Sequence, residues 1–302
     1  MFLVDKNKCH VKMNKKDRKI IHLSKKGNDT MDEFTEHIQQ PNTYLDSIQD
    51  GTNFKNQVVR MRNSLARKQT RWSVTENKLF ICALSNISNI NGDGWVTLEK
   101  ADVVESIGIG SGHSGKELRE QCQGMATKSW IKFGSSESEQ WDDGFLVNRV
   151  KSDTKHIYIK FDKAYINYLK EVGKQWTTFQ IGDISSFKSK YSIVLFQYLR
   201  SWYDPRYVIN SQAISLINLK ELFNLKKDQY VRKSGANKGK FDTSNFKKRT
   251  IDRAVEEINS ITSCHMHIEE VKVVKKHGMV WGYAFEFSLL DDEGFRLEPK
   301  LK

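Results

Sequence analysis

The stretch NFKKRTIDRAVEEINSI, residues 245–261, decides the fold when it is considered with the residues that follow it. Its apolar residues recur with the period of an α-helix; they are Ile251, Ala254, Val255 and Ile258. Two runs rich in β-branched and aromatic residues come next, at 265–274 and 279–289, and a Lys-Lys-His-Gly segment separates them. The pattern predicts a helix followed by a β-hairpin.

Basic side chains gather on this helix and around it. Residues 226–253 carry ten Lys or Arg and three acidic residues, a net charge of +7. Arg249 and Arg253 lie opposite the apolar stripe, where a helix placed in the major groove of DNA presents forked guanidinium donors to guanine. The candidate DNA-binding residues here are Asn245, Lys247, Lys248, Arg249 and Arg253 of the helix, Arg232, Lys233, Lys238 and Lys240 of a loop expected to be mobile, and Lys275 and Lys276 of the hairpin. The alternative is a solvated basic face without a partner.

An earlier part of the chain has the same order of elements. Ser73-Val74-Thr75-Glu76 is a capping box that begins a helix ending near Asn91. Thr97 is predicted to cap a second helix, Leu98 to Ile107, and a third helix spans about 114–128 and buries Leu118, Cys122 and Met125. Strands at 145–150 and 156–161 are predicted to form a hairpin, which after a helix-turn-helix is the wing of a winged helix. A helix at 163–172 then leads out of the domain.

The third helix carries a second, weaker set of candidate DNA-binding residues. Four polar side chains lie away from its apolar positions: Lys116, Arg119, Gln123 and Lys128. Glu117 and Glu120 reduce the positive charge of this helix. The alternative to DNA binding is therefore a surface helix used in dimerisation or packing. Arg60, Arg62, Arg67 and Lys68 form a further basic cluster, too loosely patterned to rank.

The sequence therefore predicts an α+β, mainly helical protein with two tandem winged-helix domains and a flexible N-terminal tail. A helix at 186–203 and a short helix at 219–224 lead into the second unit. We expect a charged tail at 1–55, a first winged-helix domain at 56–178, a second one at 179–290 that reads the DNA, and a C-terminal tail at 291–302. Residues 1–30 have a net charge of +6, whereas 31–53 hold five acidic residues and no Lys or Arg, a pattern typical of a flexible segment.

Three separated segments resemble the iteron-plasmid replication initiators. The longest is TFQIGDISSFKSKYSIVLFQYL, residues 178–199, which matches that family's S-x-Y-S-x-x-L-Y signature except that Phe196 replaces a Tyr. The other two are Asn63-Ser64-Leu65-Ala66 and residues 245–259, and the resemblance covers about 57–290. It implies a pair of winged-helix domains that bind double-stranded origin DNA with direct repeats. It also implies homodimers that repress their own promoter, monomers active at the origin, and recruitment of a host initiator and a helicase.

Composition agrees with a nucleic-acid partner. The 302 residues carry 49 Lys or Arg against 37 Asp or Glu, a net charge of +12. No stretch is apolar enough to span a membrane, and no signal peptide is visible, so we expect a cytoplasmic protein without membrane contact. The four cysteines are scattered, which indicates neither a disulfide framework nor a zinc site. We expect no cofactor, no metal and no catalytic residue.

Two motifs that suggest an enzyme are rejected on their surroundings. Residues 110–116 fit G-x-x-x-x-G-K, but Glu117 stands where a Ser or Thr would hold magnesium, and a helix is predicted before the motif instead of a strand. His265-Met266-His267 resembles the metal site of nicking enzymes, yet the only later Tyr is Tyr283, in a predicted wing strand. We expect these two histidines on the outer face of the wing. Two alternative functions stay open: a transcriptional regulator without a replication role, and, less favoured, a rolling-circle nicking endonuclease.

Overall fold

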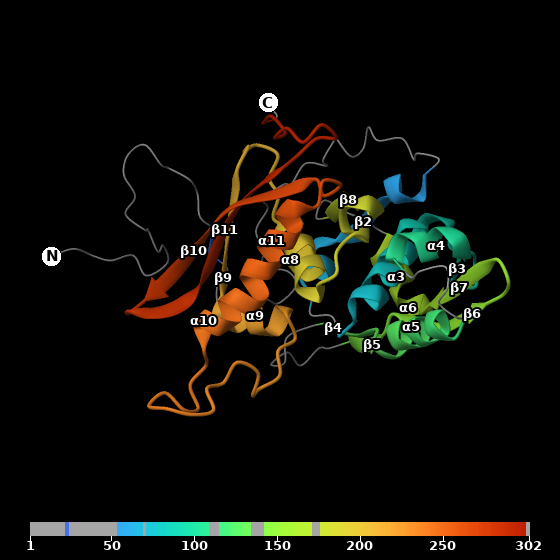
Figure 1. The fold of residues 1–302 in the computed structure, drawn as a ribbon. Helices are drawn as coiled ribbons and strands as arrows, with labels where there is room; N and C mark the ends of the chain where they lie inside the picture. The colour runs from blue at the N-terminus through green and yellow to red at the C-terminus, as the bar shows by residue number, and fades with distance from the viewer. Residues whose placement is uncertain are drawn as a thin grey trace.

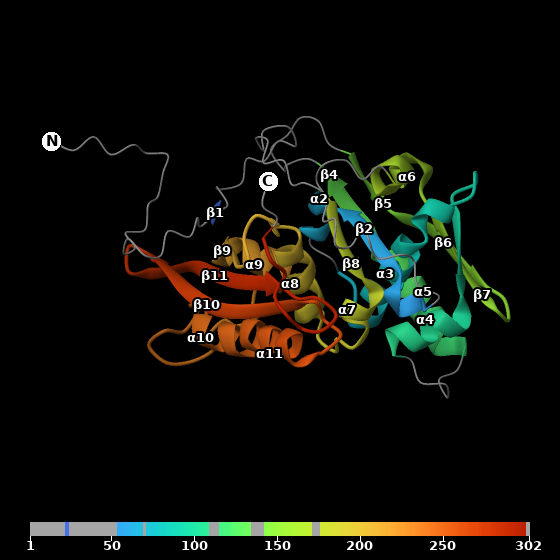
Figure 2. The ribbon, with the colours of Figure 1, turned by 90° about the horizontal axis from the view of Figure 1, so that it is seen from above.

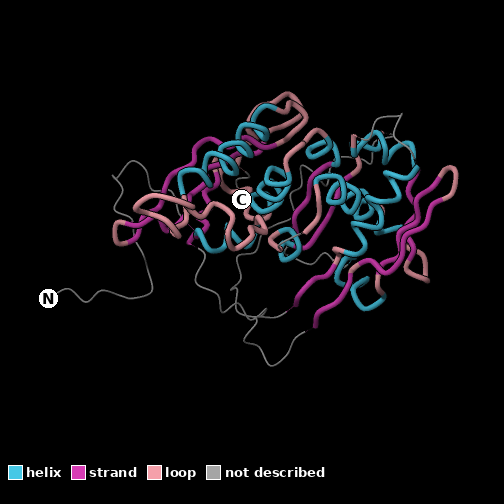
Figure 3. The backbone as a smooth tube through the Cα atoms, turned by 60° about the horizontal axis from the view of Figure 1, so that its bottom comes forward, coloured by secondary structure: helices cyan, strands magenta, loops and turns pink. Residues whose placement is uncertain are grey.

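The computed structural model describes residues 22–23, 53–68, 71–108, 115–133, 142–170 and 176–299. Two units of helices and strands lie next to each other. Figure 1 shows the hairpin of β6 (Val147–Ser152) and β7 (His156–Phe161) at one end of the molecule, and that of β10 (Met266–Lys276) and β11 (Met279–Leu289) at the other. Figure 3 shows that helices fill most of the space between the two ends.

The first unit packs helices against one face of a small sheet. Its other elements are η1 (Phe54–Asn56), β2 (Val58–Arg62), α2 (Asn63–Ala66), α3 (Val74–Ser85), η2 (Ile87–Asn89), β3 (Trp95–Glu99), α4 (Lys100–Ile107), α5 (Gly115–Thr127), β4 (Trp130–Phe133), β5 (Asp142–Phe145), α6 (Lys163–Lys170) and β8 (Trp176–Gln180). The antiparallel sheet has the order β3-β7-β6, while β2 pairs with β8 and β4 with β5. Alternate residues Val96, Ile157 and Ile159 are fully buried beneath it, as the two-residue period of a strand requires.

The predicted start of α3 is confirmed. The hydroxyl of Ser73 accepts a hydrogen bond from the backbone N–H of Glu76, and the Glu76 carboxylate accepts one from the N–H of Ser73. This reciprocal capping satisfies two N–H groups that lack partners within the helix. α3 is buried on nearly all sides, from Glu76 to Leu84, because both units pack around it.

The second helix of the first unit begins later than Thr97, so that prediction is wrong. Residues 95–99 form the strand β3, in which Thr97 pairs with Tyr158 of β7, and α4 begins at Lys100. Although the local sequence favours a helix here, the segment forms a strand because it pairs with another strand about 60 residues away. The segment before the G-x-x-x-x-G-K motif is helical, as predicted, and residues 109–114 of the motif region lie outside the described residues.

The second unit repeats the arrangement with a longer wing. Its other elements are α7 (Ile181–Ser185), α8 (Lys190–Arg200), β9 (Asn210–Ser215), α9 (Leu216–Leu222), α10 (Thr243–Phe246), η3 (Lys247–Ile251) and α11 (Asp252–Ser260). Its sheet has the order β1-β9-β11-β10, where β1 (His22–Leu23) pairs parallel to β9. The predicted hairpin is confirmed, and it turns at His277 and Gly278, both of which have positive φ, as hairpin turns of two residues favour.

Several sequence-based boundaries shift in the second unit. The helix expected from Ser186 begins at Lys190, because the Ser189 hydroxyl caps it, and α7 precedes it as a separate short helix. The helix expected from Leu219 begins at Leu216, with Ser215 as its cap. Strands β2, β4 and β9 were not among the elements expected from the sequence. Phe145, predicted in the wing, belongs to β5.

Polar contacts tie the two units together. The guanidinium of Arg67 donates to the hydroxyl and the carbonyl of Ser201 at 2.8 and 2.6 Å, and it stacks over the Trp202 ring at 3.5 Å from the centroid. Lys78 of α3 donates to the Ser185 carbonyl at 2.5 Å, and burial lowers the pKa of this amine to about 8. Figure 2 shows α8 between the strands of the first unit and α11.

Most of the predicted N-terminal tail lies outside the described residues. Two parts of it are described, namely β1 and η1, and η1 belongs to the first unit: Lys55 forms an ion pair with Glu105 at 2.9 Å. Beyond β11, Arg296 pairs with Glu269 at 2.5 Å. In the described part of the chain, no helix has the length and apolarity that a membrane span requires.

Candidate nucleic-acid interface

The helix formed by α10, η3 and α11 presents three basic side chains to solvent. Lys248, Arg249 and Arg253 are exposed, while the opposite face buries Phe246, Ile251, Ala254 and Ile258 completely. This is the division that the helical period predicts. Among the described residues, no ion pair joins these three cations to a carboxylate. Their charge is therefore available to an external anion.

The middle of this helix is wider than an α-helix. Residues 247–251 form a π-helical turn, whose hydrogen bonds run from residue i to i+5. The Lys247 ammonium forms an ion pair with the Asp252 carboxylate, five residues on. Lys247 is thus half-buried and neutralised, unlike its neighbour Lys248. Asn245, also predicted as a contact, lies half-buried in the first turn, where the Asp242 carboxylate caps its N–H.

The basic loop before the helix has the form of a hairpin in this structure. Its two sides are joined by backbone hydrogen bonds between Arg232 and Lys240 and between Gly239 and Arg232, at 3.0 and 2.9 Å. Tyr230 and Phe241 at its base pack against the ring of Phe246. Lys233, Lys238 and Lys240 are exposed at its end, and Arg232 lies 3.4 Å from the Asp242 carboxylate.

The tip of the second wing adds two more exposed cations. Lys275 and Lys276 lie beside the turn at His277, and the Lys276 ammonium is 4.3 Å from the centroid of the Trp281 ring. In Figures 1 and 2 the basic hairpin, α10 and the wing tip gather at the same end of the molecule. A recognition helix flanked by a basic loop and a basic wing can contact a groove and the phosphates on both sides of it.

The helix α5 of the first unit exposes a smaller polar surface. Lys116, Arg119 and Gln123 are exposed, and Leu118, Cys122 and Met125 are buried, as predicted. Lys128 has a structural partner: its ammonium lies 2.6 and 2.9 Å from the two oxygens of the buried Glu76 carboxylate. Its charge therefore serves the packing of α5 on α3 before it serves any ligand.

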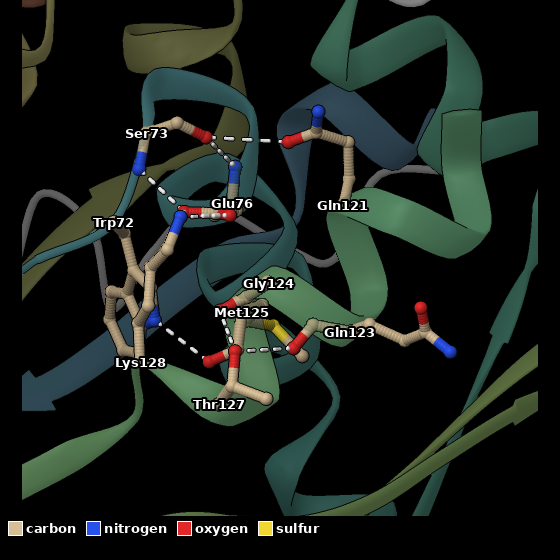
Figure 4. A network of polar contacts seen from close by, with 9 residues as sticks. All are labelled: Trp72, Ser73, Glu76, Gln121, Gln123, Gly124, Met125, Thr127 and Lys128. Carbon is tan, nitrogen blue, oxygen red and sulfur yellow. Dashed lines mark hydrogen bonds and ion pairs between the residues drawn. The ribbon is translucent and has the colours of Figure 1, made fainter.

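Figure 4 shows how the start of α3 holds the end of α5. Glu76 accepts hydrogen bonds from Ser73 and Lys128, and the Trp72 indole N–H donates to the Met125 carbonyl at 2.9 Å. Gly124 lies against the same carboxylate, and a Cβ placed there would be 2.0 Å from Glu76 Oε1. A residue without a side chain is therefore required at this position.

We expect Gly124→Ala to lower the free energy of unfolding by about 1–3 kcal/mol, because the added methyl group must displace the Glu76 carboxylate from its partners. Urea denaturation followed by circular dichroism measures the loss. Gly115→Ala is the matched control, since a Cβ at that position, in the same helix, meets no atom within 4 Å. Equal stability of the two variants would contradict the crowding at Gly124.

Other candidate residues have structural partners. Arg62 donates to the Tyr168 carbonyl, and Lys68 to that of Lys132. We expected His265 on the outer face of the wing, and this prediction is wrong. Its Nδ1 lies 2.7 Å from the buried Asp183 carboxylate, and its Nε2 lies 3.1 Å from Asp292. Within the described residues, no cluster of His, Cys, Asp or Glu could hold a metal ion.

Two helix-turn-helix units, each followed by a β-hairpin wing, define a tandem winged-helix protein. Residues 58–200 match the family model described as "Initiator Replication protein, WH1", and residues 215–287 match "Initiator Rep protein, WH2". The two matches follow each other along most of the chain. The protein belongs to the family of plasmid-type initiator replication proteins that these two domains define.

The solved structure of a replication initiator supports the fold. The chain is similar to the Pi initiator protein, whose crystal structure is described as a complex with iteron DNA: 19% of residues are identical, the TM-score is 0.61, and the match covers 79% of this chain and 99% of that one. The chain is also weakly similar to domains 2 and 3 of RctB: 12% of residues are identical, the TM-score is 0.41, and the match covers 72% of this chain and 80% of that one. No curated protein sequence matches the chain significantly.

Proposed function

We propose that this protein initiates plasmid replication by binding directly repeated origin sequences, the iterons, with both winged-helix units. The observation that carries the proposal is the recognition helix of the second unit, which exposes Lys248, Arg249 and Arg253 between a basic hairpin and a basic wing. Membership of the initiator family supports it, as does the iteron DNA bound by the similar Pi protein.

The geometry suggests a division of work. Arg249 and Arg253 reach base edges in the major groove, where a guanidinium forms two hydrogen bonds with guanine. The hairpin residues Lys233, Lys238 and Lys240 and the wing residues Lys275 and Lys276 neutralise phosphates beside that groove. In the first unit, α5 uses Lys116, Arg119 and Gln123 on an adjacent part of the repeat. Because Arg67 holds the two units together, they bind neighbouring parts of one DNA repeat.

The finer steps of initiation follow from the family resemblance. Monomers bind the iterons and open adjacent AT-rich DNA, and they recruit a host initiator and a helicase. Homodimers bind the promoter of the gene and repress it. The protein contributes binding energy and no catalysis, without cofactor or metal, and it works in the bacterial cytoplasm.

Replication of a minimal plasmid tests the proposal. A plasmid that carries this gene and its flanking DNA, but no other origin, should be maintained, and it should be lost when the gene is interrupted. The purified protein should bind a duplex with the flanking direct repeats, spaced by about two helical turns, more tightly than a permuted duplex. Maintenance without the gene would instead favour the transcriptional regulator, because repression does not require replication from the repeats.

A further inference from the structure

A second basic surface lies on the three-stranded sheet of the first unit, on the face turned away from the core. Strand pairing places five side chains on its outward face: Trp95 opposite Lys160, Lys160 opposite Arg149, and Tyr158 opposite Lys151. The intervening residues Val96, Ile157 and Ile159 point into the core, so the five share the other face. Figures 1 and 2 show these strands at the end of the molecule farthest from β10 and β11.

Within the described part of the chain, the cations on this face have no acidic partner. Arg149 and Lys151 are exposed, Lys160 is half-buried, and no ion pair joins any of them to a carboxylate within the described ranges. The nearest acids, Asp153 and Glu99, are engaged with neighbouring groups at the edge of this face. Asp153 accepts hydrogen bonds from the N–H groups of 155 and 156 and from the Tyr158 hydroxyl, and these bonds hold the pKa of Asp153 well below its usual value. Glu99 contacts His156 at 3.0 Å.

The two aromatic rings, Trp95 and Tyr158, are half-buried and lie among these cations. The Lys151 ammonium is 4.8 Å from the centroids of both Trp95 and Tyr158, and the Lys160 ammonium is 5.6 Å from that of Trp95. Because a cation reaches the ring faces, a flat base can reach them as well. A base that replaces the ammonium on a ring also frees that ammonium to bind the neighbouring phosphate.

We propose that this face, defined by Trp95, Arg149, Lys151, Tyr158 and Lys160, binds single-stranded DNA. A sheet face that combines aromatic rings with cations suits unstacked bases and their backbone. Duplex DNA offers phosphates but hides its base faces, so it would leave the two rings unused. An acidic protein surface would pair with the cations but would not need the rings. The face is separate from the surfaces assigned to the repeats, so this site extends the proposed function and does not depend on it.

The test measures the affinity of the full-length protein for a fluorescein-labelled oligothymidylate of about 20 nucleotides by fluorescence anisotropy. We expect the double variant Lys151→Ala/Lys160→Ala to bind about tenfold more weakly or worse. The slope of log K against log salt should also fall by about 1.4, because two phosphate contacts are lost. Trp95→Leu should weaken binding as well, and circular dichroism checks that it remains folded.

The matched control is Lys163→Ala/Lys170→Ala, which removes two exposed charges from α6 of the same unit. It should bind the oligonucleotide within about twofold of the unaltered protein. Both double variants should retain their affinity for the direct-repeat duplex. Arg253→Ala should lose affinity for the duplex and retain its affinity for the oligonucleotide. Unchanged oligonucleotide binding by Lys151→Ala/Lys160→Ala, an equal loss in the control, or an equal loss of duplex binding would each overturn the proposal, and the first would leave an acidic protein as the partner of this face.

Discussion

Replacing both exposed arginines of the recognition helix, Arg249→Ala/Arg253→Ala, should abolish most of the discrimination between the direct repeats and random duplex. A guanidinium that reads a base contributes about 1–3 kcal/mol, so the pair should cost about 2–6 kcal/mol, or roughly 30-fold to 20,000-fold in affinity for the repeats. Affinity for random duplex should fall less. Fluorescence anisotropy with both duplexes, at one stated salt concentration, measures the two losses.

Because both arginines are exposed, the free energy of unfolding of the double variant should lie within about 0.5 kcal/mol of that of the unaltered protein. Lys163→Ala/Lys170→Ala on α6 again serves as the control for lost charge. If Arg249→Ala/Arg253→Ala weakens both duplexes equally, the arginines contact phosphates and do not read bases. If it binds the repeats with unchanged affinity, the recognition helix has been assigned wrongly.

The exposure of these arginines could be predicted because it depends only on the helical period. Ile251, Ala254 and Ile258 define the buried face, and the arginines lie opposite them. Local sequence was equally sufficient for the capping of α3, where Ser73 and Glu76 are three residues apart. These features are set by neighbours along the chain.

Contacts between distant segments were not predictable in this way. The strand β3 forms because its partner β7 lies about 60 residues further on, and no local signal reveals that pairing. β9 was missed because Asn210, Ser211 and Gln212 lack the alternation of apolar residues that marks a strand, although the strand lies inside the sheet. The ion pair of Lys128 could not be foreseen, because its partner, Glu76, comes 52 residues earlier.

The same limit applies to His265, whose partners lie 82 residues before it and 27 residues after it. Asp183, which is almost completely buried, accepts hydrogen bonds from the backbone N–H groups of Gln180 and His265 as well as from the imidazole. The bond to Asp183 raises the pKa of His265 above its usual value, more than burial and the nearby Arg200 lower it. The contact joins α7 to the first strand of the second wing, so its charge state affects how the wing is held.

Stability should therefore depend on pH through this contact. Because the pKa of His265 is higher in the folded than in the unfolded chain, the contribution is complete below about pH 6.5 and is lost as the pH rises through the folded value. We expect urea midpoints to decline over this range in the unaltered protein. His265→Gln should lower stability in acid and remove this part of the decline.

Asp183→Asn should show the larger loss, about 3 kcal/mol near pH 6, because it leaves a charged imidazole partly buried without its carboxylate. The loss should shrink as the pH rises through the raised pKa of His265, because the imidazole then becomes neutral. Asp292→Asn is the matched control: this carboxylate contacts the other nitrogen of the same ring but is mostly exposed, so its removal should cost less than about 1 kcal/mol. Losses of similar size in the two variants, or a loss in Asp183→Asn that does not change with pH, would show that the buried ion pair does not hold the wing.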